Sequence, residues 1–167
     1  MTSLLKALVV EDNEAFLRFI CSTLQETSQF QVMEAFDGLE AVQMAEETQP
    51  DLVLLDIGLP ELSGIEVGRR IRRLAPHAKL LFVSSESAPD VVRETFRLGG
   101  RAYVDKARCD CDLNEEGTQV PFDNLLDRVT GSDPSVTDYI LESPAKCPRC
   151  RHGLLERPES NQYRRIE

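Results

Sequence analysis

Short apolar runs alternate with amphipathic stretches from the start of this chain to about Lys106. The clearest run, LVLL at residues 52–55, lies between two aspartates and has no polar residue of its own. A short apolar run bounded by charged residues is typical of a strand that is buried on both faces. Strand and helix patterns that alternate in this way predict an α/β fold, in which a parallel sheet carries helices on both faces.

The apolar runs predict strands at residues 4–10, 31–35, 52–55, 80–83 and 102–104. Between them, apolar residues recur at the spacing of one helix face. The first helix is expected at about 13–27, and the others are expected to end before Pro50, near Leu74 and at Gly99. A basic run on the third helix is expected to form its solvated face, and it comprises Arg69, Arg70, Arg72 and Arg73.

The chain carries a net charge of −10, from 19 basic and 29 acidic residues. Direct DNA binding is therefore not expected, because it needs a basic face that neutralises phosphates. No apolar run approaches the roughly 20 residues of a membrane-spanning helix, and the N-terminal run contains Lys6, unlike a signal peptide. We expect a cytoplasmic protein with no membrane partner, whose five cysteines are thiols or metal ligands rather than disulfides.

Polar side chains stand where four of the predicted strands end. They are Glu11 and Asp12 after the first strand, Asp56 after the third, Ser84 after the fourth and Lys106 after the fifth. Ligands of open parallel sheets bind beyond the carboxyl ends of the strands, so we expect these side chains to converge there. Three close carboxylates repel one another unless a cation neutralises them, and Mg²⁺ prefers such oxygen ligands. Asp56 is then a candidate nucleophile that forms an aspartyl phosphate, with Lys106 and Ser84 contacting the phosphoryl oxygens.

Four segments of the chain resemble the receiver domain of two-component response regulators. They are ALVVEDNEAF, LVLLDIGLPELSGIE, LLFVSSES and GGRAYVDKA. The match spans a core at about residues 3–107 and is similar to receivers that usually precede a LuxR-type helix-turn-helix domain. This resemblance implies a flavodoxin-like fold, with five parallel strands and helices on both faces of the sheet.

The resemblance also implies a role for each residue of the site. Asp56 is implied to accept a phosphoryl group from a sensor histidine kinase, assisted by Lys106. The implied Mg²⁺ ligands are Glu11, Asp12, Asp56 and the backbone carbonyl of Gly58. The implied switch residues are Ser84 and Tyr103, whose movement changes the surface that a partner reads. Such a protein is a signalling switch and not an enzyme, apart from its own phosphorylation and dephosphorylation.

The chain departs from this family after Lys106. A fifth helix normally follows within a few residues, whereas here segment 108–121 is acidic and aperiodic, and an amphipathic pattern resumes only at 122–130. Either the loop is enlarged and 122–130 form a short fifth helix, or that helix is missing; we expect the first, because an uncovered apolar sheet face is costly. The receiver domain is thus predicted at 1–130, with a linker and a small irregular extension at 131–167. No helix-turn-helix of the usual size follows, so output is expected through an effector protein or a homodimer.

The extension contains Cys147 and Cys150 in the sequence Cys-Pro-Arg-Cys, which resembles half of a zinc ribbon. Two thiolates at this spacing chelate one ion, and tetrahedral zinc needs two further ligands. Cys109 and Cys111 can supply them, His152 can supply one, or two chains can share the ion. A redox-active pair and unligated thiols stay open as alternatives. An alternative function is therefore a phosphorylation-independent, zinc-stabilised adaptor with a receiver-like fold.

Overall fold

The structure, a computed structural model, describes residues 3–86, 88–106, 139–141, 155–156 and 164–165. Strands and helices alternate through its first part. In chain order they are β1 (Leu5–Val10), α1 (Glu14–Glu26), β2 (Phe30–Ala35), α2 (Gly38–Thr48), β3 (Leu52–Leu55), α3 (Gly64–Leu74), β4 (Lys79–Ser84), α4 (Pro89–Arg97) and β5 (Gly100–Asp105). In the part of the chain that the structure describes, no helix is long and apolar enough to span a membrane.

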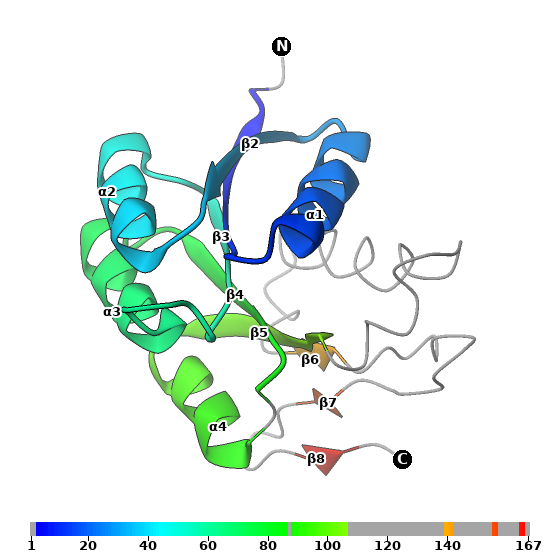
Figure 1. The fold of residues 1–167 in the computed structure, drawn as a ribbon, viewed down its shortest axis with the longest axis vertical. Coiled ribbons are helices and arrows are strands. Elements are labelled where there is room, and N and C mark those ends of the chain that lie inside the picture. Colours follow the sequence, from blue (N-terminus) through cyan, green and yellow to red (C-terminus); the bar gives the residue numbers. More distant parts are fainter. Residues whose placement is uncertain (1–2, 87, 107–138, 142–154, 157–163, 166–167) are drawn as a thin grey trace.

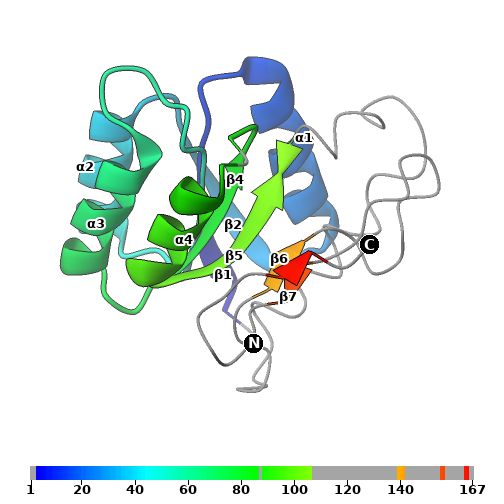
Figure 2. The ribbon, with the colours of Figure 1, turned by 90° about the horizontal axis from the view of Figure 1, so that it is seen from below.

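The first five strands form a parallel sheet in the order β2-β1-β3-β4-β5. The order changes direction at β1 and β3, which pair with each other although α1, β2 and α2 separate them in the chain (Figure 1). Helix α1 lies on one side of the sheet, and α2 and α3 lie on the other (Figure 2). The predicted flavodoxin-like α/β fold is confirmed.

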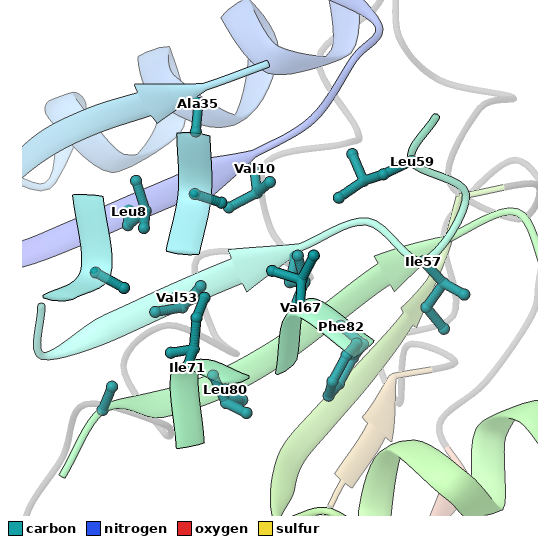
Figure 3. Packing of buried hydrophobic residues seen from close by; sticks show 14 of the residues in the cluster. Leu8, Val10, Ala35, Val53, Ile57, Leu59, Val67, Ile71, Leu80 and Phe82 are labelled. Atoms are coloured by element: carbon teal, nitrogen blue, oxygen red, sulfur yellow. The ribbon is translucent and has the colours of Figure 1, made fainter. Parts of the chain in front are cut away.

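Both faces of the sheet are apolar and buried. Successive residues of a strand point to opposite faces, so Leu52 and Leu54 belong to the cluster that contains the buried residues of α1. Val53 and Leu55 belong to the other cluster, with apolar residues of α2, α3 and α4, among them Ile71 (Figure 3). This burial on both sides explains why the LVLL strand has no polar position.

Helices α1, α2 and α3 each begin at a residue whose side chain accepts a backbone hydrogen bond. These capping residues are Asn13, Asp37 and Ser63, and each accepts from the N–H three residues further along. A cap satisfies a donor that the first turn leaves unpaired, so it fixes where the helix starts. The caps of α1 and α3 thereby also fix the ends of the loops that carry Glu11 and Asp56.

One arginine of the predicted solvated face of α3 is half-buried. Nη1 of Arg72 donates to the carbonyls of Pro76 and Ala78 at 3.1 and 3.3 Å, and Nη2 donates to the carbonyl of Gly99 at 2.6 Å. The prediction was wrong for this residue, because the end of α3 lies beside the turns that lead into β4 and β5 and these turns present their carbonyls to it. The other three arginines of the run are exposed or partly exposed, as expected.

Three short strands continue the sheet beyond β5, namely β6 (Tyr139–Leu141), β7 (Leu155–Glu156) and β8 (Arg164–Arg165). β6 runs parallel to β5, whereas β7 and β8 are antiparallel to their neighbours. The sequence analysis predicted an irregular extension and did not anticipate them, because strands of two or three residues are too short to show an alternating pattern. The predicted enlarged loop (108–121) and possible fifth helix (122–130) lie outside the described residues.

Candidate functional site

The parallel strands bring four of the predicted site residues to one edge of the sheet. Glu11 directly follows β1, Asp56 follows β3, Ser84 ends β4 and Lys106 follows β5. β1 pairs with β3, β3 with β4, and β4 with β5 without a change of direction. The carboxyl ends of these strands therefore lie side by side, which is where open parallel sheets bind their ligands.

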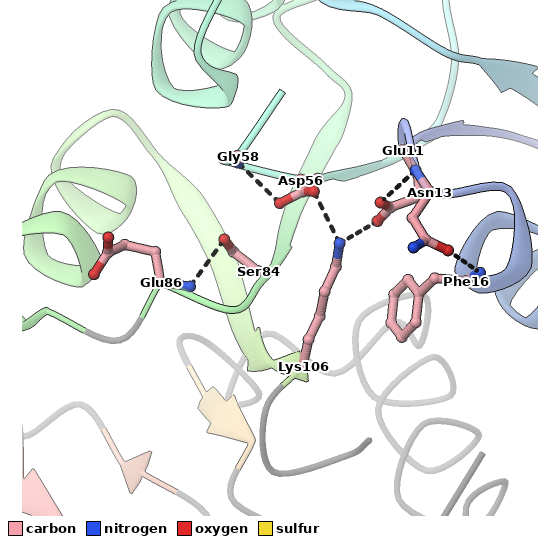
Figure 4. A network of polar contacts seen from close by, with 8 residues as sticks. All are labelled: Glu11, Asn13, Phe16, Asp56, Gly58, Ser84, Glu86 and Lys106. Carbon is pink, nitrogen blue, oxygen red and sulfur yellow. Dashed lines mark hydrogen bonds and ion pairs between the residues drawn. The ribbon is translucent and has the colours of Figure 1, made fainter. Parts of the chain in front are cut away.

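Lys106 lies between the two buried acids of the site (Figure 4). Its Nζ is 2.8 Å from Oδ2 of Asp56, and it also forms an ion pair with Oε2 of Glu11. The side chains of Lys106, Asp56 and Glu11 are only 10%, 7% and 1% exposed. Charges so far from solvent persist only when they are paired, so the ammonium and the two acids depend on one another.

Three carboxylates form the acidic part of the site. Glu11, Asp12 and Asp56 each offer an oxygen atom, and these atoms lie within 4.8 Å of one another. Glu11 and Asp56 are buried, whereas Asp12 is exposed and gives the cluster access to solvent. A donor set made only of carboxylate oxygens fits a hard cation such as Mg²⁺, which takes a few carboxylates and keeps several waters.

The protonation of Glu11 is sensitive to its surroundings. Burial is the main cause that raises the pKa of Glu11 from 4.5 to about 7; the charge of Asp56 acts in the same direction, and the hydrogen bond and charge of Lys106 oppose both. A cation bound between the carboxylates would favour the ionised form. A divalent cation bound there would therefore compete with a proton for Glu11 near neutral pH.

Backbone groups hold the two buried carboxylates in place. The N–H of Gly58 donates to Oδ1 of Asp56 at 2.9 Å, and the N–H of Asn13 donates to Oε1 of Glu11 at 3.0 Å. In each acid the second oxygen is the one that contacts Lys106. Gly64 is needed for the same loop, because a Cβ atom at this position would lie 1.9 Å from the carbonyl oxygen of Asp56. The role of the Gly58 carbonyl as a metal ligand stays a prediction.

Ser84 ends β4, which pairs with β3, and Tyr103 lies on β5, which pairs with β4. Ser84 is buried, and its Oγ accepts a hydrogen bond from the N–H of Glu86 at 3.2 Å. Tyr103 is buried as well, in the cluster that contains Phe82, its partner in the register of β4 and β5. The two residues are thus inside the protein next to the site, and their part in a switch stays a prediction.

The sequence analysis missed one residue of the site. Phe16 fits the apolar face of the first helix and was not singled out there, yet Nζ of Lys106 lies over the Phe16 ring, 4.6 Å from its centroid. Phe16 is the first buried residue of α1. The available signal was its position in the first turn of the helix that directly follows the acidic pair.

The cysteines of the chain divide into two groups. The predicted zinc ligands Cys109, Cys111, Cys147 and Cys150 lie outside the described residues, so zinc binding stays a prediction. Cys21 is described and belongs to the apolar cluster of α1. Burial, together with the nearby Glu34, raises the pKa of its thiol to about 12, so Cys21 is a core residue and not a reactive thiol.

Known proteins are similar to part of this chain in sequence and in fold. A family model, the response regulator receiver domain, matches residues 7–115. The chemotaxis protein CheY of Listeria monocytogenes is 35% identical over 104 residues, which are 62% of this chain and 87% of that protein. The response regulator domain of Thermotoga maritima CheB has a TM-score of 0.64 and 26% identity, covering 76% of this chain and 94% of that domain. A LuxR-family two-component response regulator from Aurantimonas has a TM-score of 0.58 and 27% identity, covering 74% and 86%.

Proposed function

The chain belongs to the response regulator receiver family, and from this premise we propose that Asp56 is the residue that accepts its phosphoryl group. Homology to CheY is consistent with a phosphoryl-accepting regulator. The observation that carries the assignment to Asp56 is the 2.8 Å contact with Lys106 inside a cluster of three carboxylates. A buried acid held by a backbone N–H and by the ammonium of Lys106 has the orientation that a nucleophile needs.

Receiver domains bind Mg²⁺ in an acidic pocket, and we assign this pocket here to Glu11, Asp12 and Asp56, with the backbone carbonyl of Gly58. The three carboxylates fit the ion because their oxygens lie within 4.8 Å of one another and one of them reaches solvent. When bound, the ion would neutralise charge on the carboxylates and on an incoming phosphoryl group. Competition between this ion and a proton follows from the raised pKa of Glu11.

The remaining side chains supply the other parts of a phosphoryl transfer. A carboxylate oxygen of Asp56 bonds to phosphorus while the bond from phosphorus to the donor breaks and its electron pair leaves with the donor. Lys106 stays protonated and offsets negative charge on the phosphoryl oxygens. The Ser84 hydroxyl donates to another phosphoryl oxygen once it has moved toward Asp56.

Receiver domains interact with histidine kinases and effector domains. For this chain we propose a sensor histidine kinase as the phosphoryl donor, and an effector protein or a second copy of the chain as the reader. The switch would begin when Ser84 moves toward the phosphoryl group and Tyr103 changes position in β5. Both side chains are buried, so their movement requires repacking between β4 and β5 and thereby changes the surface there. The only chemistry assigned to the chain itself is its own phosphorylation and dephosphorylation.

The test is phosphorylation of the full chain with acetyl phosphate and Mg²⁺, followed by intact mass. We expect one alkali-labile phosphoryl adduct on the parent protein and none on Asp56→Asn. The matched control is Asp51→Asn, which changes the aspartate at the other end of β3, where Oδ2 accepts a hydrogen bond from the N–H of Lys6. This control is expected to be phosphorylated like the parent. An adduct that persists in Asp56→Asn, or a parent that takes none, would contradict the assignment.

A further inference from the structure

Among the residues that the structure describes, the ammonium of Lys106 has three partners at the site, and they differ in kind. Two are the carboxylates of Asp56 and Glu11, and the third is the face of the Phe16 ring, 4.6 Å away (Figure 4). Both carboxylates belong to the acidic cluster that is suited to hold the divalent cation. The ring is neutral and offers no ligand atom, so of these three partners it is the one that the cation does not compete for.

We propose that Phe16 is a positioning residue, which keeps the Lys106 ammonium beside Asp56 when the metal ion occupies the carboxylates. This inference rests on the proposed phosphorylation of Asp56. A lysine side chain has many rotamers and a strongly hydrated charge, so a lysine that loses its anionic partners tends to turn toward water. An ammonium over an aromatic face is held by the ring quadrupole, and the ring also excludes water from that side.

The fold makes Phe16 a rigid support. The residue is 7% exposed and packs in the cluster of α1. Its backbone N–H donates to the capping side chain of Asn13 at 3.0 Å, which fixes the first turn of the helix. Its ring also contacts that of Phe19, with 5.9 Å between the centroids. The ring therefore holds its position independently of the charges around Lys106.

The role assigned to Phe16 involves no change in bonding at Lys106. With acetyl phosphate as donor, an oxygen of Asp56 bonds to phosphorus, the bond between phosphorus and the acetate oxygen breaks, and acetate leaves with the electron pair. Lys106 keeps its proton, and its charge offsets that of the phosphoryl oxygens. A ring that fixes the ammonium near Asp56 thus acts on the rate of this step through Lys106 and touches no reacting atom.

The test compares three variants of the full chain with acetyl phosphate at saturating Mg²⁺. Phe16→Leu keeps an apolar side chain without a ring, Phe16→Tyr keeps the ring, and Phe19→Leu removes the neighbouring ring of the same helix. We expect phosphorylation to slow about fivefold in Phe16→Leu and to stay near the parent rate in Phe16→Tyr. In Phe19→Leu, which removes only one packing contact of the Phe16 ring, the slowing should be much smaller. Urea denaturation of each variant checks that the compared proteins are folded.

Two further measurements separate a positioning role from a loss of packing. In a Lys106→Met background, adding Phe16→Leu should not slow phosphorylation any further, because the ammonium that the ring holds is gone. In NMR spectra of the Mg²⁺-loaded parent, the side-chain methylene protons nearest Nζ of Lys106 should show a ring-current shift that Phe16→Tyr retains and Phe16→Leu loses.

The outcomes distinguish this inference from the proposed function beneath it. If the parent protein is not phosphorylated, the proposed function fails. If the parent is phosphorylated and Phe16→Leu is phosphorylated at the same rate, the role of Phe16 is refuted while the proposed function stands. The same holds if Phe16→Leu slows phosphorylation by the same factor with Lys106 present and in the Lys106→Met background. A slowing in Phe19→Leu as large as that in Phe16→Leu would also refute it, because the effect would then belong to the packing of α1.

Discussion

The two ends of the parallel sheet each hold a cation, Lys106 buried and Arg72 half-buried, but with different partners. At the carboxyl ends of the strands, Lys106 pairs with the carboxylates of Asp56 and Glu11. At the amino ends of β4 and β5, Arg72 donates to three backbone carbonyls and has no carboxylate among its hydrogen-bond partners in the described residues. Carbonyls are neutral and do not titrate, whereas carboxylates titrate and attract divalent cations through a full negative charge. The difference indicates that one end of the sheet is built for stability and the other for chemistry.

The largest loss of stability is expected from a substitution at Gly64, where the loop after β3 meets α3. In Gly64→Ala the new Cβ would lie 1.9 Å from the carbonyl oxygen of Asp56, so the backbone must shift and we expect a loss of about 4 kcal/mol in unfolding free energy. At the other end of the sheet, Gly99 has a φ of 98° and a Cβ there would meet the flexible end of Arg72 at 2.8 Å. Gly99→Ala should cost less, about 1–2 kcal/mol. Urea denaturation measures both, and equal losses would contradict this account.

The next largest effect is expected at Arg72. Arg72→Met leaves three carbonyls without their donor, and we expect it to lower the unfolding free energy by about 3 kcal/mol. Phosphorylation of the folded protein by acetyl phosphate should be unchanged, because Arg72 lies at the end of the sheet away from Asp56. Arg73→Met is the control, since Arg73 is exposed and its loss should leave stability nearly unchanged. A variant of Arg72 that folds normally but is phosphorylated slowly would show that the two ends are coupled.

The pH dependence of stability should come from the site at the carboxyl ends of the strands. The pKa of Glu11 is about 7 in the folded protein and 4.5 is its ordinary value, so between these values the folded state binds the proton and the unfolded state does not. Without Mg²⁺, the contribution of Glu11 to the unfolding free energy should therefore fall by about 2 kcal/mol as the pH rises from about 5 to 7.

This contribution is measured as the difference between the parent protein and Glu11→Gln in urea denaturation at several pH values. The neutral glutamine should remove the fall with pH. Saturating Mg²⁺ should weaken or reverse it in the parent, because the cation stabilises the ionised carboxylate. A parent and a variant with parallel pH profiles would mean that Glu11 titrates normally.

The smallest effect is expected on the surface between the two ends. Arg69 of α3 pairs with Glu66 of its own helix at 3.5 Å and with Glu94 of α4 at 2.5 Å, in a partly exposed position. Exposed ion pairs contribute little because water and salt screen them. Arg69→Ala should therefore leave the midpoint of urea denaturation unchanged within error, and a clear decrease would show that α4 depends on this contact.

The sequence was sufficient to predict the five-stranded core and the convergence of Glu11, Asp56, Ser84 and Lys106, because both follow from a simple geometric rule. Apolar runs mark the strands, and parallel strands bring the residues that follow them to one edge. The rule concerns where a residue stands and not what its side chain contacts. It therefore placed Asp56 and Lys106 at the same edge but could not show that Lys106 also contacts Glu11.

Three features could not be predicted from the sequence for physical reasons. Phe16 fits the apolar spacing of a helix, and that spacing does not distinguish a ring that packs against leucines from one that holds an ammonium. Arg72 belongs to a run of arginines that look alike in sequence, and only the turns at the end of α3 single it out. Strands β6, β7 and β8 form by pairing with strands that are separated from them in the sequence. Their own two or three residues are too few to show the alternating pattern of a strand.

The pairing of β5 with β6 has a consequence for the outer side of the sheet. Ala102, Tyr103 and Val104 are matched one to one with Tyr139–Leu141, so the backbone of β5 already has a neighbour along this stretch. An incoming strand from another molecule would have to displace β6 before it could add to the sheet there. A displacement of the main chain at Tyr103 would also be transmitted directly to β6, through amide-to-carbonyl bonds and without the help of any side chain.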